Sequence, residues 1–173
     1  YKALAQLSIK EGSNKFELEK PIGIAEDFNL NGTKTLYGTS KYTSELIIQE
    51  YADFHGLNSI INRFGVISGK GQLGSEEQGF VSLWLARHYY KDSLKYIGYS
   101  GSGKQCRDIL SIKDVCKLVK KQINEKKLRY GEVFNVGGGI KNTISLKELT
   151  LKCENLTGNK INIDKIYENR LDK

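Results

Sequence analysis

The segment LYGTSKYTSELIIQEY, residues 36–51, carries most of the information about the fold of this chain. Apolar side chains recur near helical spacing at Leu36, Leu46, Ile47, Tyr51 and, just beyond the segment, Phe54. Gly56 follows as a residue type that commonly ends a helix. We therefore predict a helix over residues 35–54, and LNSIINRF, residues 57–64, then reads as a buried strand.

Tyr37 and Lys41 lie four residues apart in this segment, which places a phenol and an ammonium on one face of the predicted helix. A phenol ordinarily has a pKa of about 10, and a neighbouring cation favours its ionised form. The pair could therefore exchange protons near neutral pH. Because the chain has 10 Tyr and many Lys among 173 residues, such a spacing also arises by chance, and the surrounding sequence must decide its meaning.

The remaining sequence alternates between strand and helix patterns. Strands are predicted over 94–99, 106–110 and 131–136, and helices over 79–90, 111–127 and 145–156. The helix predicted over 111–127, the third along the chain, has an expected apolar face of Val115, Leu118, Val119 and Ile123. The alternation predicts an α/β fold.

Turn signals and caps give the ends of several elements. Residues 1–33 contain the only proline, Pro21, and the turn signal Asn31-Gly32, so we expect a long connecting loop there. Ser145 and Glu148 have the spacing of a capping box before the last helix.

Composition excludes several classes of protein. The chain is 39% hydrophobic and 27% charged, typical of a globular protein, and it has no apolar run long enough to span a membrane. Its net charge of +7 comes mainly from Lys scattered along the whole length, which favours solvation and attraction of small anions over nucleic-acid binding. No secretion signal is visible, and we expect a cytoplasmic protein without a membrane partner.

Cysteine and histidine patterns do not suggest a metal centre. Cys106, Cys116 and Cys153 are odd in number and share no C-x-x-C spacing, so we predict neither a disulfide framework nor a zinc site. His55 and His88 are far apart and are expected to be surface or packing residues.

The motif GYSGSGKQ, residues 98–105, matches the glycine and lysine positions of a phosphate-binding loop. Gln105 stands where that loop needs Ser or Thr, and the next residues, CRDIL, are typical of a strand rather than of a helix. The motif therefore favours a turn between two strands.

Several segments, taken together and in order, resemble a known family. They are LYGTSKYTSELIIQEY, NRFGVISGKGQ, QGFVSLWLARHYY, YIGYSGSGKQCRDIL with SIKDV, and FNVGGG before ISLKELT, within about residues 22–160. This order is similar to that of the extended short-chain dehydrogenases/reductases, the NAD-dependent epimerase/dehydratase group that acts on nucleotide sugars. Within that family the chain looks most like the CDP-paratose (CDP-tyvelose) 2-epimerase branch.

The resemblance implies an α/β fold made of the second half of a Rossmann-type NAD-binding domain and a smaller C-terminal substrate-binding domain. Residues 1–66 would belong to the first domain and 67–173 mainly to the second, with about 106–136 returning to the first. The glycine-rich dinucleotide fingerprint is then expected before residue 1, and the chain, which does not begin with Met, is expected to be part of a longer one.

The resemblance also implies roles for individual residues. Tyr37 would be the acid/base, and Lys41 would favour its phenolate and bind the nicotinamide ribose of NAD. Arg107 would contact the pyrophosphate of a nucleotide sugar, which suits a guanidinium fork. A solvated surface Tyr and Lys, and an Arg107–Asp108 structural pair, are the alternatives.

Three glutamines complete the implied substrate site, namely Gln72, Gln78 and Gln105. The implied activity is NAD-dependent epimerisation of a nucleotide-activated sugar through transient oxidation and return of hydride. A nucleotide-sugar 4,6-dehydratase and a non-catalytic dinucleotide-binding protein remain alternatives. The resemblance further implies a homodimer for the full-length protein, and it suggests that the 173 residues alone are inactive.

Overall fold

A computed structural model describes residues 7–19, 23–76, 78–125 and 127–168 of the chain, so Pro21 lies outside the described residues. Four helices are present in these ranges: α1 (Leu36–His55), α2 (Phe80–Tyr90), α3 (Ile112–Asn124) and α4 (Leu146–Thr157). The strands are β1 (Ile9–Glu11), β2 (Phe16–Leu18), β3 (Ser59–Phe64), β4 (Val66–Ser68), β5 (Leu94–Ile97), β6 (Cys106–Ser111), β7 (Tyr130–Val136), β8 (Thr143–Ser145) and β9 (Ile163–Ile166). The predicted α/β class is confirmed.

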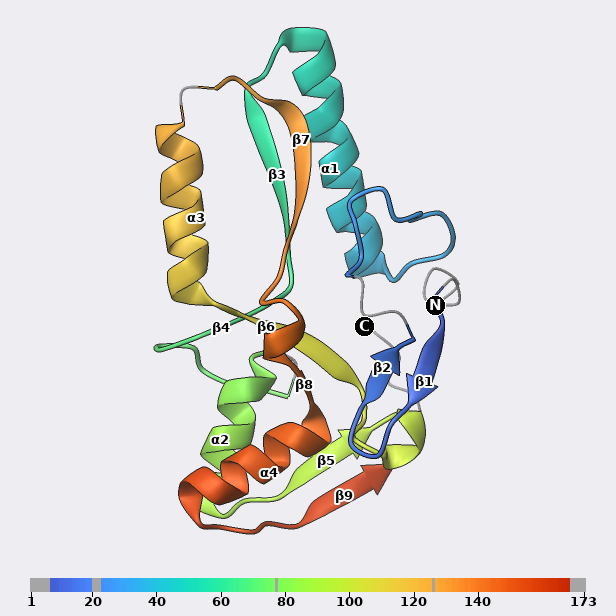
Figure 1. Cartoon of the computed structure of the whole chain (residues 1–173), viewed down its shortest axis with the longest axis vertical. Coiled ribbons are helices and arrows are strands. Elements are labelled where there is room, and N and C mark those ends of the chain that lie inside the picture. The colour runs from blue at the N-terminus through green and yellow to red at the C-terminus, as the bar shows by residue number, and fades with distance from the viewer. Residues whose placement is uncertain (1–6, 20–22, 77, 126, 169–173) are drawn as a thin grey trace.

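A parallel pair of strands positions the most informative helix. β3 pairs with β7 in parallel, with Ile61 opposite Val133 and Arg63 opposite Asn135. Figure 1 shows α1 on one side of this pair and α3 on the other. Parallel strands covered on both sides by helices are the arrangement of a Rossmann-type sheet.

The second group of elements contains the largest buried cluster of the described residues. β5 pairs with β9 in parallel, and α2 packs against α4 beside them (Figure 1). Trp84, Leu94, Tyr96, Leu149 and Cys153 form the cluster. Inside it the Thr150 hydroxyl accepts hydrogen bonds from Trp84 Nε1 at 3.0 Å and from the Tyr96 hydroxyl at 2.7 Å, because its own proton goes to the carbonyl of Leu146. The buried polar atoms of the cluster are thereby paired.

A three-stranded sheet, ordered β4-β6-β8, lies between these two groups in Figure 1. β4 follows β3 almost directly and pairs with β6 in parallel, whereas β6 pairs with β8 in antiparallel orientation. β6 therefore runs close to the carboxyl ends of β3 and β7.

The helix ends follow the sequence signals closely. Thr35 caps α1 by accepting a hydrogen bond from the Gly38 N–H, and Gly56 ends the helix with φ of 65°. The Ser145–Glu148 capping box is present in α4. The helix predicted over 111–127 is α3, which ends at Asn124 and is therefore shorter than expected.

Some predictions are wrong. The expected connecting loop over residues 1–33 contains an antiparallel hairpin, β1–β2, and the short strands β4, β8 and β9 were not predicted. Ile123, assigned to an apolar face of the third helix, is exposed. Strands of three or four residues are too short to display a clear period of two, so sequence patterns do not reveal them.

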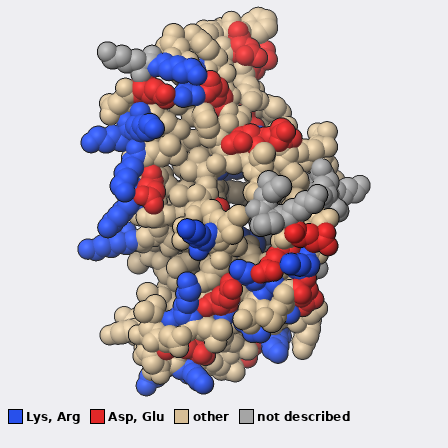
Figure 2. All heavy atoms as spheres, viewed as in Figure 1, with Lys and Arg blue, Asp and Glu red and all other residues tan. Residues whose placement is uncertain are grey.

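Charges are distributed as expected for a solvated surface. Figure 2 shows Lys and Arg along the edge where α3 lies, and elsewhere they alternate with Asp and Glu. Within the described ranges no helix is both long and apolar enough to cross a membrane. The same residues contain no group of three metal-ligating side chains that could hold an ion.

Candidate active site

Tyr37 and Lys41 lie in the first two turns of α1, and the structure brings their side chains together. The Lys41 ammonium nitrogen is 5.5 Å from the centroid of the Tyr37 ring. Tyr37 is 63% exposed, so its hydroxyl is open to an incoming molecule. Among the described residues, Lys41 forms no ion pair with a carboxylate, and its ammonium group remains available to a ligand.

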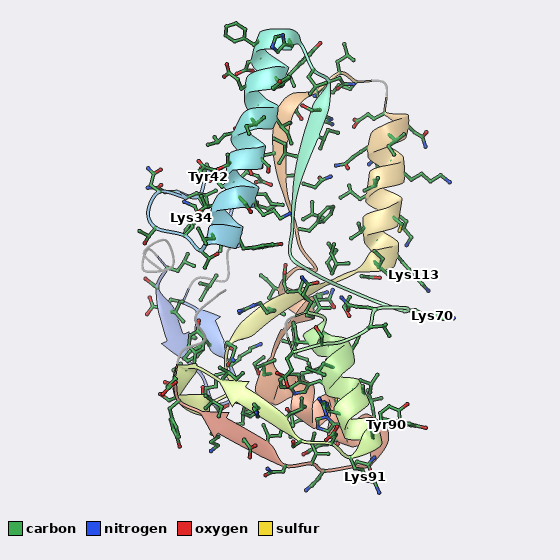
Figure 3. All side chains as sticks on the ribbon, turned by 180° about the vertical axis from the view of Figure 1, so that it is seen from behind. Lys34, Tyr42, Lys70, Tyr90, Lys91 and Lys113 are labelled. Atoms are coloured by element: carbon green, nitrogen blue, oxygen red, sulfur yellow. The ribbon has the colours of Figure 1, made fainter. Side chains whose placement is uncertain are left out.

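A second tyrosine–lysine contact on the same helix provides a comparison. Lys34 and Tyr42 lie side by side at the start of α1 (Figure 3), with the ammonium nitrogen 4.9 Å from the ring centroid. Lys34, however, donates hydrogen bonds to the carbonyls of Leu30 and Gly32, so its charge is used to close the loop before the helix. Of the two contacts, only the Tyr37–Lys41 pair combines an exposed phenol with an uncommitted cation.

The carboxyl ends of β3 and β7 lie at the same level as the start of α1 in Figure 1. Gly65 follows β3 and Gly137 follows β7, and a side chain built on either glycine would collide with the Asp108 carboxylate of β6. The two glycines thus let β6 approach the strand ends closely. In open α/β sheets the carboxyl edge is where ligands bind.

Arg107 is the second residue of β6, and Gln105 immediately precedes the strand. Arg107 is exposed, and within the described ranges it donates one hydrogen bond, from Nη1 to the Cys106 carbonyl at 2.7 Å. No ion pair joins Arg107 to Asp108 within the described part of the chain.

Gln105 is held by a hydrogen bond from Nε2 to the Ile97 carbonyl at 3.4 Å. Its Oε1 is buried and has no hydrogen-bond partner among the described residues. An unpaired buried acceptor is costly, and a ligand N–H or O–H would satisfy it.

The other two predicted glutamines lie in the loop between β4 and α2. Gln72 donates from Nε2 to the Ile67 carbonyl at 3.2 Å and accepts from the Ser82 hydroxyl at 3.4 Å, so it ties the loop to both elements. Gln78 is exposed, and its backbone closes a turn with Ser75. Their predicted contact with substrate stays a prediction.

Sequence patterns did not point to two charged residues, one in α1 and one near the end of β3, that join these two elements. Glu45 is buried in α1 and forms a two-pronged ion pair with Arg63 of β3. The available signals were weak: Glu45 stands one turn after Lys41, and Arg63 interrupts an apolar strand.

The phosphate-loop-like motif is a turn, as expected. A 3-10 turn, Tyr99–Gly101, joins β5 to β6, and β6 rather than a helix follows Lys104. The Lys104 ammonium pairs with Glu11 at 2.7 Å.

The three cysteines are free thiols. Burial raises the pKa of the Cys106 and Cys153 thiols, which keeps both protonated and unreactive at neutral pH.

Comparison with known proteins agrees with this arrangement. Residues 16–137 match the model of the NAD dependent epimerase/dehydratase family. The CDP-paratose 2-epimerase of Salmonella typhi is 33% identical over 153 residues, covering 86% of this chain and 45% of that protein.

Solved structures share the fold. UDP-glucuronic acid 4-epimerase from Bacillus cereus superposes with a TM-score of 0.73 at 23% identity, over 87% of this chain and 45% of that chain. dTDP-glucose 4,6-dehydratase from Bacillus anthracis gives a TM-score of 0.68 at 21% identity, over 85% and 46%.

The matched proteins are longer than this chain, which spans 33–45% of the length of the curated relatives. The family match covers most of the chain and includes α1, β3, β6 and β7, the elements that carry the candidate site. The Rossmann-type fold predicted from the sequence is confirmed by the solved structures. This chain belongs to the NAD dependent epimerase/dehydratase family.

Proposed function

We propose that this chain supplies the acid/base helix and the substrate-binding part of an enzyme that epimerises a nucleotide-activated sugar. The observation that carries the proposal is the exposed Tyr37 phenol beside the Lys41 ammonium, which forms no ion pair among the described residues. The likeness to CDP-paratose 2-epimerase favours a CDP-linked sugar as the substrate. The activity is proposed for the intact enzyme, in which this chain is joined to a glycine-rich dinucleotide-binding half.

The residues fit one end of NAD. A lysine ammonium and a phenol on one open helix face can bind ribose hydroxyls, and both are present in α1. When bound there, NAD would accept the hydride that leaves a sugar carbon and then return it to the opposite face.

Tyr37 would move the proton that accompanies this hydride. As phenolate it would take the proton of the sugar hydroxyl while the hydrogen on the same carbon leaves with its bonding electron pair as hydride, so the alcohol becomes a ketone. When the hydride returns to that carbon, Tyr37 would give the proton back to the oxygen, and the sugar undergoes no net oxidation. Lys41 would favour the phenolate through its charge.

Arg107 of β6 and Gln105, just before that strand, would bind the substrate. Arg107 has N–H groups free to bind a diphosphate, and the unpaired Gln105 Oε1 can accept from the sugar or the base. We also propose that residues 67–173 form mainly the substrate-binding domain, with about 106–136 returning to the Rossmann-type domain. A cytoplasmic location and a homodimer complete the proposal.

Replacing Tyr37 by Phe in the intact enzyme tests the chemistry. The change removes only the hydroxyl, so we expect turnover to fall at least about a hundredfold while NAD still binds. Turnover is measured as conversion of a CDP-linked sugar to its epimer, and NAD binding by calorimetry.

Tyr42→Phe is the matched control, because it removes a hydroxyl from the same helix beside Lys34 and should leave turnover unchanged. Turnover of Tyr37→Phe within about threefold of wild type would rule out Tyr37 as the acid/base, since that role contributes about a hundredfold or more. A wild-type product lacking the elements of water would identify a 4,6-dehydratase instead. NAD binding without any turnover would identify a non-catalytic member.

A further inference from the structure

Arg63 and Glu45 form the most buried ion pair among the described residues, and it joins a strand end to the acid/base helix. Arg63 Nε donates to Glu45 Oε2 at 2.8 Å, and Nη2 donates to Oε1. Glu45 is 8% exposed, and its hydrogen bonds raise the pKa of Arg63 above the ordinary value. A fork-to-carboxylate contact of this kind fixes direction as well as distance.

The same guanidinium also contacts the segment that leads into α1. Arg63 Nη1 donates to the carbonyl of Glu26 at 3.2 Å. Asn135, which stands opposite Arg63 in β7, donates from its backbone N–H to Glu26 Oε1 at 2.8 Å and from Nδ2 to the Ile24 carbonyl at 2.9 Å. Paired residues of two parallel strands thus hold both α1 and the segment before it.

Glu45 lies on the same side of α1 as Tyr37 and Lys41, so its contact with Arg63 affects how the helix is rotated. Tyr37, Lys41 and Glu45 follow one another at intervals of four residues, so they form a single stripe that turns by only about 40° per step. Glu45 lies about 12 Å along the axis from Tyr37. A fork that fixes Glu45 therefore fixes the rotation of the helix about its axis, and with it the direction of the Tyr37 hydroxyl.

We propose that Arg63 and Glu45 are positioning residues that aim Tyr37 and Lys41 at the reacting sugar carbon. The inference rests on the proposed function, because it assigns the pair a role through Tyr37. A purely stabilising role is the competing explanation, yet replacing a buried ion pair by well-packed apolar side chains of similar size often causes no loss of stability. The two explanations therefore predict different activities for a variant that keeps α1 packed on β3 but lacks the directional ion pair.

That variant is Glu45→Met with Arg63→Met in the intact enzyme. Methionine fills the space of both side chains but provides no fork, so the helix remains packed and can rotate slightly. We expect kcat to fall about tenfold to a hundredfold, since a displacement near 1 Å at a reacting group has effects of that size. KM should stay within about threefold, because the groups that bind the diphosphate are untouched.

A matched control removes a similar ion pair at the other end of the same strands. Arg129 precedes β7 and donates to both carboxylate oxygens of Glu125 at 3.0 and 3.1 Å, and it also pairs with the partly exposed carboxylate of Glu132. Arg129→Met with Glu125→Met should change neither kcat nor KM. If the first double variant does not fold, Arg63→Lys keeps the charge but contacts one oxygen only, and kcat should fall about threefold to tenfold.

The outcomes separate this inference from the proposed function. A kcat within about threefold of wild type in the methionine pair, or a loss that only follows the unfolded fraction in thermal melts, would overturn the positioning role. If Tyr37→Phe is also fully active, the proposed function itself fails. If Tyr37→Phe is inactive and the methionine pair is active, only the positioning role is wrong.

Discussion

Arg107 has a side chain with N–H groups to spare at the start of β6. Among the residues that the structure describes, a single hydrogen bond, to the Cys106 carbonyl, anchors the exposed guanidinium, so most of its donors have no protein partner there. Such an arrangement is expected if a diphosphate is the missing partner, because phosphate oxygens match the planar donor fork. The charge of a diphosphate is the same in substrate and transition state, so the contact should affect affinity more than rate.

Arg107→Ala in the intact enzyme should therefore raise KM for the nucleotide sugar and leave kcat nearly unchanged. Loss of a charge-assisted contact of about 1.5 to 3 kcal/mol corresponds to about a tenfold to hundredfold rise in KM. Steady-state kinetics over a range of substrate concentrations measures both constants. Arg107→Lys should recover only part of the affinity, since an ammonium cannot form the fork. An unchanged KM with a lower melting temperature would instead make Arg107 a structural residue.

Residue patterns predicted a contact of the candidate site that joins residues close in sequence, the one between Tyr37 and Lys41. The spacing of four between Tyr37 and Lys41 is sufficient to place both on one helix face, and the structure confirms their contact. The Arg63–Glu45 pair joins residues 18 apart on different elements, and no local rule relates them. The unpaired Gln105 Oε1 likewise depends on burial that only the folded chain creates.

Helix α1 shows how a correct element can have an unexpected orientation. Its existence and both ends were predicted, but Leu36, Ile47 and Phe54 of the apolar pattern face outward, and the inward face contains Glu45 and Ala52. An apolar stripe normally indicates the buried face. Here the polar Glu45 is buried because Arg63 compensates its charge, so periodicity alone identifies the wrong side.

At the start of α4 the sequence predicted the capping box but not the contact that Ser145 makes with a distant part of the chain. Ser145 Oγ accepts from the Glu148 N–H at 3.0 Å, and the Glu148 carboxylate accepts from the Ser145 N–H at 2.9 Å. The structure adds a contact across 131 residues, because the same hydroxyl donates to the Asn14 carbonyl at 2.8 Å. Ser145 therefore links the β1–β2 hairpin to α4 and is fully buried.

Ser145→Ala should destabilise the protein more than removal of an ordinary cap. The loss of the cap costs about 0.5 to 2 kcal/mol, and the loss of the second hydrogen bond, to the Asn14 carbonyl, adds about 0.5 to 1.5 kcal/mol. Ser111→Ala is the matched control, since Ser111 caps α3 but is exposed, and its loss should cost about 1 kcal/mol. Urea unfolding measures both. Equal losses in the two variants would show that the Asn14 contact contributes no stability.

On the scale of the whole molecule, the alternation of strands and helices predicted the α/β class, whereas the strand pairing could not be predicted from local pattern. β3 and β7 are separated by two helices and several strands, and β5 pairs with β9 after a similar interval. Such long-range pairing depends on which faces are buried together. Family resemblance supplied the Rossmann-type arrangement, because the order of motifs carries information that periodicity lacks.

The outward apolar face of α1 bears on assembly. Leu36 is 88% exposed and Phe54 79%, and Ile47 lies on the same side of the helix. Large apolar side chains gathered on one face of a surface helix are typical of an interaction site. A two-fold symmetric dimer would pair this face with its own copy, which is the commonest way for identical chains to associate. This agrees with the proposed homodimer of the intact enzyme.

Ile47→Asp with Phe54→Asp should therefore convert the intact enzyme from dimer to monomer, because a dimer would bury four carboxylates against apolar side chains without partners. Light scattering coupled to size-exclusion chromatography measures the mass, which should halve. Leu156→Asp is the control: Leu156 is 77% exposed on α4, away from this face, and the variant should remain a dimer. A double variant that keeps the dimeric mass would place the interface on another surface, and a monomeric wild type would contradict the homodimer itself.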